Sequence, residues 1–294
     1  MLKYLKPLVI SFIMIVQLSS CAGKKESPED KVAKIPPVEE LYNTGMNQVQ
    51  KADYKDAIKT FAQIEQEYPY SQWATQGHLM SAYAMFEDEF YDESIDSLER
   101  FISLHPGHKS VSYAYYLKAL CYYNRISTVN RDQDMTSKAG DSLQEVILRF
   151  PHSPYAKDAR AKLDLVSDHL AGKEIEIGRF YLKQGNLLSA INRYKKVLEN
   201  YQTTSHTPEV LYRLVEAYVQ LGVNVEAQKY AAVLGFNYPG STWYQYAFGL
   251  MNSKHIPVKK AQDLKAKPSW WKGDWIKKDK KNNNENTQTE IQPQ

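Results

Sequence analysis

The sequence predicts an all-α protein, an α-solenoid of five stacked helix pairs plus a capping helix. One pattern of small and apolar residues recurs five times between residues 38 and 239. Within each recurrence the apolar residues are spaced i, i+4 and i+7, as on one face of a helix. No alternation of apolar and polar residues indicates a strand. Because a single helix pair cannot bury its apolar face alone, the five pairs are expected to stack.

Residues 1–20 have the pattern of a removable signal peptide. A basic start with Lys3 and Lys6 precedes an apolar run that is too short to span a membrane. The run ends with two serines before Cys21, which resembles the lipobox of bacterial lipoproteins, where the cysteine thiol carries a diacylglycerol. The alternative is an ordinary signal with an incidental cysteine. Ala22 rather than aspartate follows, so the resemblance implies a lipid anchor at the periplasmic face of the outer membrane.

The remainder of the chain divides into a tether, a body and a tail. Residues 21–37 are poor in apolar side chains and end in two prolines, which predicts a lipidated flexible tether. The body holds repeats 1–3 over residues 38–153 and repeats 4–5 with a cap over 154–253. The expected helices are 38–51 with 54–67, 71–87 with 91–104, 109–125 with 135–149, 155–184 with 187–200, 206–221 with 223–236, and a cap at 240–252.

Small residues define each helix pair, because they let its two helices approach closely. Each first helix carries one, or a valine, at the same position: Gly45, Ala82, Ala119, Gly178 and Val215. Each second helix carries one as well: Ala57, Ser94, Ala139, Ala190 and Ala227. Four residues later comes a side chain that fills the space between the helices: Phe61, Leu98, Leu143, Tyr194 and Ala231.

Each unit ends with an aromatic ring, followed in four of the five by proline, which stops the second helix. The rings are Tyr68, His105, Phe150, Tyr201 and Tyr238, and Gln202 replaces the proline of the fourth unit. This small–small–aromatic–proline pattern resembles the tetratricopeptide repeat. The period is 37 residues from Pro69 to Pro106 and lengthens to 45 at Pro151 because of an insertion at 126–136.

The first helix of each pair is expected to line the concave face. Units one to three would present an aromatic groove there, suited to an extended peptide with large apolar side chains. The alternative is that these rings only pack between neighbouring helices. The candidate substrate-peptide residues are Tyr42, Tyr83, Phe86, Tyr113, Tyr116 and Tyr123.

Units four and five present polar side chains at the same positions. Arg179, Lys183, Tyr212 and Glu216 are the candidates for docking a folded partner through charges at the rim. A tail over 254–294 follows, with ten lysines and three aspartates between residues 254 and 281. Its Trp270, Trp271 and Trp275 predict a membrane or partner contact, and the alternative is a disordered linker.

The insertion and the corners between units resemble the BamD family, the lipoproteins of the outer-membrane β-barrel assembly machinery. The resemblance rests on Asn130-Arg131-Asp132-Gln133 before the third repeat and on corners such as Tyr68-Pro69-Tyr70-Ser71 and Phe150-Pro151-His152-Ser153. It implies a non-enzymatic subunit. Its partners would be the barrel-forming subunit and other assembly lipoproteins, and it would bind the C-terminal signals of unfolded outer-membrane proteins.

No enzyme motif occurs. His-Glu-x-x-His, Gly-x-Ser-x-Gly and a phosphate loop are all missing, and no catalytic residue, cofactor or metal site is expected. His105 and His108 bracket one corner and are interpreted as surface loop residues, and Cys121 as a buried, inert thiol. Two other functions are considered. One is a periplasmic adaptor coordinating peptidoglycan synthesis with envelope constriction, and the other is a hydrolytic lipoprotein, for which 254–294 is too short to form a catalytic domain.

Overall fold

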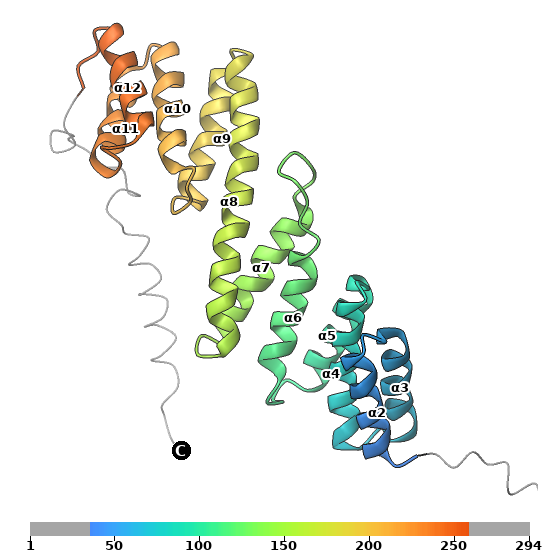
Figure 1. The fold of residues 1–294 in the computed structure, drawn as a ribbon. Helices are drawn as coiled ribbons and strands as arrows, with labels where there is room; N and C mark the ends of the chain where they lie inside the picture. The colour runs from blue at the N-terminus through green and yellow to red at the C-terminus, as the bar shows by residue number, and fades with distance from the viewer. Residues whose placement is uncertain (1–35, 259–294) are drawn as a thin grey trace, which may run out of the picture.

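A computed structural model describes residues 36–258, and the predictions for the signal, Cys21, most of the tether and most of the tail lie outside this range. Within it the protein is an elongated stack of eleven α-helices without strands (Figure 1). Every boundary lies within two residues of the predicted one. The helices are α2 (Val38–Gln50), α3 (Tyr54–Glu67), α4 (Gln72–Glu87), α5 (Tyr91–Leu104), α6 (Val111–Tyr123), α7 (Asp134–Arg149), α8 (Pro154–Lys183), α9 (Leu187–Asn200), α10 (Thr207–Gln220), α11 (Asn224–Asn237) and α12 (Thr242–Ser253).

The corners between units position the next helix. The serine that ends each aromatic–Pro–x–Ser corner is the N-cap of the following helix, and its hydroxyl accepts a backbone N–H three residues on. Ser71, Ser153 and Ser241 do this at 3.1–3.2 Å for α4, α8 and α12. At the second corner His108 stands in the place of the serine, and its Nδ1 accepts the N–H of Ser110 at 3.2 Å. The second corner therefore lacks the serine but keeps a side-chain acceptor for a backbone N–H near the start of α6.

Side-chain size is matched across the two helices of each pair. A Cβ at Gly45 would lie 2.7 Å from Cε1 of Phe61, and one at Gly178 would overlap the ring of Tyr194. Both rings are fully buried. In the second and third units alanine replaces the glycine and leucine replaces the ring, and in the fifth Val215 accompanies Ala231. A larger side chain on the second helix thus faces a smaller residue on the first, which keeps the helix pairs close-packed.

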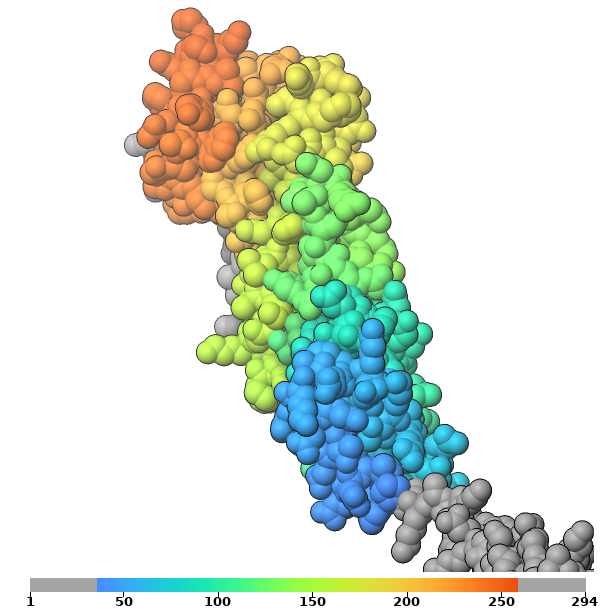
Figure 2. Space-filling view, turned by 45° about the vertical axis from the view of Figure 1, so that its right-hand side comes forward, coloured from blue at the N-terminus to red at the C-terminus, as the bar shows by residue number. Residues whose placement is uncertain are grey.

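The long helix α8 belongs to two stacks at once. Its N-terminal part packs against α7 and its C-terminal part against α9, so α8 closes the first three units and opens the last two. The N-terminal half of the molecule, from blue to green, and the C-terminal half, from yellow to orange, lie one above the other along the long axis (Figure 2). The largest continuous core lies in the C-terminal half, around Tyr194, Leu211 and Leu214.

The insertion between α6 and α7 is tied to the middle of α8. Gln133 donates from Nε2 to the backbone carbonyls of Thr128 and Arg131 at 3.2 and 3.0 Å. Lys173 on α8 donates to the carbonyls of Asn130 and Arg131 at 3.1 and 3.3 Å. The loop therefore has a fixed backbone beside the helix that joins the two halves.

Cys121 is buried, as predicted, whereas His105 and His108, predicted as surface loop residues, are partly buried against a core ring. The Cys121 thiol is fully buried, and burial raises its pKa to about 11, so it is protonated at neutral pH. His105 and His108 both pack on the ring of Phe101, with ring centroids 5.3 and 5.5 Å apart. No group of side chains within residues 36–258 could hold a metal ion.

Candidate peptide and partner surfaces

Four tyrosines from three helices form an aromatic surface in the N-terminal half. Tyr155, in the first turn of α8, packs against Tyr113 and Tyr116 of α6 with ring centroids 5.4 and 5.2 Å apart. Tyr83 of α4 packs against the same buried cluster as Tyr113. All four are partly exposed. We call Tyr83, Tyr113, Tyr116 and Tyr155 the aromatic surface.

Two carboxylates border the aromatic surface. Burial, together with a hydrogen bond to Glu87, raises the pKa of Tyr83 to about 12. The hydroxyl of Tyr116 donates to Asp158, which also pairs with Lys162 at 3.5 Å. Burial also raises the pKa of Tyr113 and Tyr116, so these tyrosines remain neutral at physiological pH. The surface offers apolar ring faces edged by Glu87 and by the ion pair of Asp158 with Lys162.

The structure does not bring all six predicted peptide residues together. Tyr42 packs between Phe61 and Trp73, with centroids 5.9 and 4.8 Å apart, in a separate core cluster of the first unit. Phe86 packs on Tyr91 of the neighbouring helix at 5.9 Å. For these two residues the structure matches the alternative of packing between helices.

Tyr123 lies beneath a charge near the same surface. Its ring centroid is 5.0 Å from Nζ of Lys162, the lysine that also pairs with Asp158. This cation–π contact covers one face of the ring. Of the six candidates, Tyr83, Tyr113 and Tyr116 therefore share one surface, while Tyr123 lies at its margin.

Sequence reasoning missed Tyr155. The predicted concave positions lie in the first helix of each unit, and Tyr155 lies at the start of α8, several turns ahead of the fourth unit's own concave positions. The N-terminal part of α8 packs beside α6 as another first helix would. The length of the predicted helix at 155–184 was the signal that could have revealed this.

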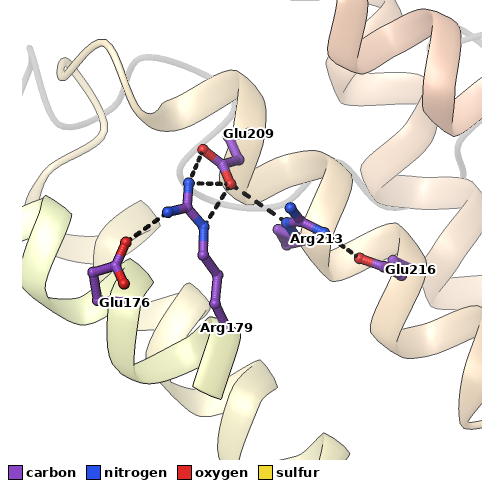
Figure 3. A network of polar contacts seen from close by, with 5 residues as sticks. All are labelled: Glu176, Arg179, Glu209, Arg213 and Glu216. Carbon is purple, nitrogen blue, oxygen red and sulfur yellow. Dashed lines mark hydrogen bonds and ion pairs between the residues drawn. The ribbon is translucent and has the colours of Figure 1, made fainter. Parts of the chain in front are cut away.

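The predicted docking residues of the C-terminal half take part in a chain of ion pairs (Figure 3). Arg179 of α8 holds Glu209 of α10 through Nε at 2.9 Å and through Nη2, and it pairs with Glu176 at 2.6 Å. Arg213 connects Glu209 to Glu216, at 3.4 and 2.9 Å. Glu209, with 9% of its side chain exposed, was not predicted as a site residue. It ties the two helices together.

The glutamate partners of both arginines favour the charged guanidinium and raise its pKa. Burial by itself lowers the pKa of Arg179 and Arg213, and the hydrogen bonds and charges of their glutamate partners outweigh this effect, so both pKa values are raised. The two guanidinium groups are thus permanently charged and held in fixed orientations. Lys183 is exposed beside them and forms none of the ion pairs seen within residues 36–258.

The C-terminal half is less polar than predicted. Tyr212 packs against Trp243 and Tyr246 of α12, with ring centroids 5.5 and 6.0 Å apart. Arg213 lies over the rings of Tyr212 and Trp243, at 5.4 and 5.7 Å. The sequence predicted α12 only as a cap, so its two aromatic residues were missed. The capping helix packs beside α10 as the first helix of a further unit would. The corner Tyr238-Pro239-Gly240-Ser241, which has the form of the corners between units, was the available signal in the sequence.

None of the helices within residues 36–258 is both long enough and apolar enough to cross a membrane. Structural comparison finds tetratricopeptide proteins. The TPR2AB-domain:pHSP90-complex of yeast Sti1 has a TM-score of 0.42 and 11% identity over 74% of this chain and 86% of that one. A thermophilic TPR protein of Thermus thermophilus has a TM-score of 0.33 and 16% identity over 73% of this chain and 100% of that one.

Sequence comparison identifies the family. The chain is 47% identical to outer membrane protein assembly factor BamD of Caulobacter vibrioides, over 84% of this chain and 81% of the relative. It is 48% identical to the BamD of Rickettsia prowazekii, over 86% of this chain and 99% of that one. The model of the YfiO family, described as an outer membrane lipoprotein, matches residues 36–234. The chain therefore belongs to the YfiO family of outer membrane lipoproteins, the family of the assembly factor BamD.

Proposed function

We propose that this protein is a non-enzymatic subunit of the machinery that folds and inserts β-barrel proteins into the outer membrane. Relatives at 47% and 48% identity carry the name of outer membrane protein assembly factor. A stack of helix pairs offers extended surfaces rather than an enclosed catalytic cleft. The lipobox ending at Cys21 would anchor the chain to the periplasmic face of the outer membrane, since several acyl chains make a stable anchor.

The two halves would divide the work of this subunit. The aromatic surface of the N-terminal half would bind segments of unfolded outer-membrane proteins, because its partly exposed rings give large contact area at small entropic cost. The C-terminal half would hold the barrel-forming subunit. The single observation that carries the first role is the contact of Tyr155 with both Tyr113 and Tyr116, which joins two helices into one partly exposed aromatic patch.

Replacing Tyr83 and Tyr116 together by alanine should weaken binding of an aromatic-rich, uncharged peptide by about tenfold or more. Each lost ring removes contact area of the kind that dominates peptide interfaces. Both residues are only partly buried, so the fold should persist. Fluorescence anisotropy of a labelled peptide with the full-length chain in detergent gives the affinity.

The matched control is Tyr70→Ala. Tyr70 is fully exposed, at 101% relative accessibility, and lies at a corner away from these helices. Its replacement should leave the peptide affinity unchanged. Equal affinities of the Tyr83→Ala/Tyr116→Ala variant and the parent, with intact far-UV dichroism, would remove the aromatic surface from the proposed function.

A further inference from the structure

A pocket lies between the C-terminal end of α8 and α10, next to the ion pairs of Figure 3. Its volume is about 380 Å³, and it is lined by Arg179, Leu182, Lys183, Arg213, Glu216 and Gln220. This volume is within the range of small ligand-binding sites. Three of the six lining side chains are cationic, and one is acidic.

The three cations of the pocket differ in how many ion pairs they already form. Arg179 is bound by Glu176 and Glu209, and Arg213 by Glu209 and Glu216. Nη2 of Arg213 forms none of the hydrogen bonds found between described residues, and Lys183 is exposed without an ion pair there. A carboxylate could therefore pair with Lys183 and with the free edge of Arg213 without displacing an existing partner.

An aromatic cluster lies beside the same pocket. Tyr212, Trp243 and Tyr246 are in mutual contact, with Trp243 and Tyr246 5.9 Å apart, and Tyr246 is 57% exposed. Arg213 links the two features, because its guanidinium lines the pocket and also lies over the rings of Tyr212 and Trp243. An incoming side chain that packs on these rings would be adjacent to Arg213.

We infer that this pocket and cluster form a second peptide-binding site, which takes a segment where an aspartate or glutamate side chain neighbours an aromatic residue. The carboxylate would pair with Lys183 and Arg213, and the ring would pack on Trp243 and Tyr246. The N-terminal aromatic surface has no unpaired cation in the same position, since Glu87 and the Asp158–Lys162 pair border it. Charge complementarity would thus direct acidic–aromatic segments to the C-terminal site. The inference deepens the proposed function and rests on the docking role of this half.

The test uses three peptides with blocked ends that differ in one residue beside a tyrosine: aspartate, asparagine or lysine. Binding to the full-length chain in detergent is measured by fluorescence anisotropy, with Tyr83 and Tyr116 replaced by alanine so that the first surface does not contribute. The aspartate peptide should bind best and the lysine peptide worst. Lys183→Glu should weaken binding of the aspartate peptide by about tenfold or more, as expected for a charge-assisted contact.

Two further variants make the outcome specific. Tyr246→Ala should weaken the binding of all three peptides, because it removes the exposed ring. Lys55→Glu, at an exposed lysine of α3 in the other half, should change none of them. Equal binding of the aspartate and asparagine peptides, or an unchanged affinity in Lys183→Glu, would overturn the inference. A fourth peptide, the asparagine peptide with a free C-terminal carboxylate, would overturn it as well if it bound while the three blocked peptides did not, since the site would then recognise a chain end. The proposed function fails separately, when an uncharged aromatic peptide binds the parent and the Tyr83→Ala/Tyr116→Ala variant equally well.

Discussion

Gly178→Ala should destabilise the protein by about 1–2 kcal/mol, although alanine is the better helix former. The new Cβ would overlap the ring of Tyr194, which is fully buried. Overpacking of this kind costs about 1–3 kcal/mol, and the gain in helix propensity offsets up to about 1 kcal/mol. Urea unfolding followed by far-UV circular dichroism measures the change in free energy of unfolding.

Gly178→Ala should cost less when Tyr194 is replaced by leucine as well. Gly178→Ala with Tyr194→Leu recreates the alanine–leucine pair of the second and third units. The loss of unfolding free energy in the double variant should therefore be smaller than the sum of the two single losses, by about 1 kcal/mol or more. Gly249→Ala is the control, because a Cβ there meets no atom within 4 Å and should be neutral or stabilising. Strictly additive costs of the two substitutions would contradict size matching between the helices of a pair.

Glu209→Ala should cost about 2 kcal/mol, because it leaves two arginines without their shared carboxylate. Removing one partner of a buried ion pair costs about 3–5 kcal/mol, and the partial exposure of Arg179 and Arg213, at 40% and 25%, reduces this. Breaking the exposed pair of Asp56 and Lys59 by Asp56→Ala should change stability by at most about 0.5 kcal/mol. The same urea titration compares them. Equal, small effects would show that the ion pairs of Figure 3 do not hold α8 to α10.

The sequence predicted the helices well because the solenoid is specified locally and repeatedly. The spacing from Ala57 to Phe61 to Ile64 fixes the buried face of one helix, and all three side chains are fully buried. The aromatic–proline corner fixes where that helix stops. The serine that completes the corner caps the next helix, as Ser71 does for α4. Such signals act within a few residues and do not depend on contacts between distant units.

Side-chain placement between units could not be predicted in the same way. Tyr155 belongs to the N-terminal aromatic surface because α8 packs beside α6, and Trp243 contacts Tyr212 because α12 packs beside α10. Both contacts depend on how neighbouring units stack. The pairing of Arg179 with Glu209 also crosses between helices 30 residues apart in sequence. Concave positions in the repeat indicated Arg179 and Glu216 as charges offered to a partner. They did not indicate that Arg179 already pairs with Glu209 and that Glu216 already pairs with Arg213.

The most direct test of the account is purification of the tagged full-length protein from detergent-solubilised envelopes, with quantitative mass spectrometry of the proteins that accompany it. The parent protein should bring down a stoichiometric barrel-forming subunit together with unfolded outer-membrane proteins. The Tyr83→Ala/Tyr116→Ala variant should keep the former and lose most of the latter. Peptidoglycan synthases or envelope-constriction proteins in place of the barrel-forming subunit would contradict the assembly function. Unchanged recovery of unfolded outer-membrane proteins by the variant would contradict the role of the aromatic surface.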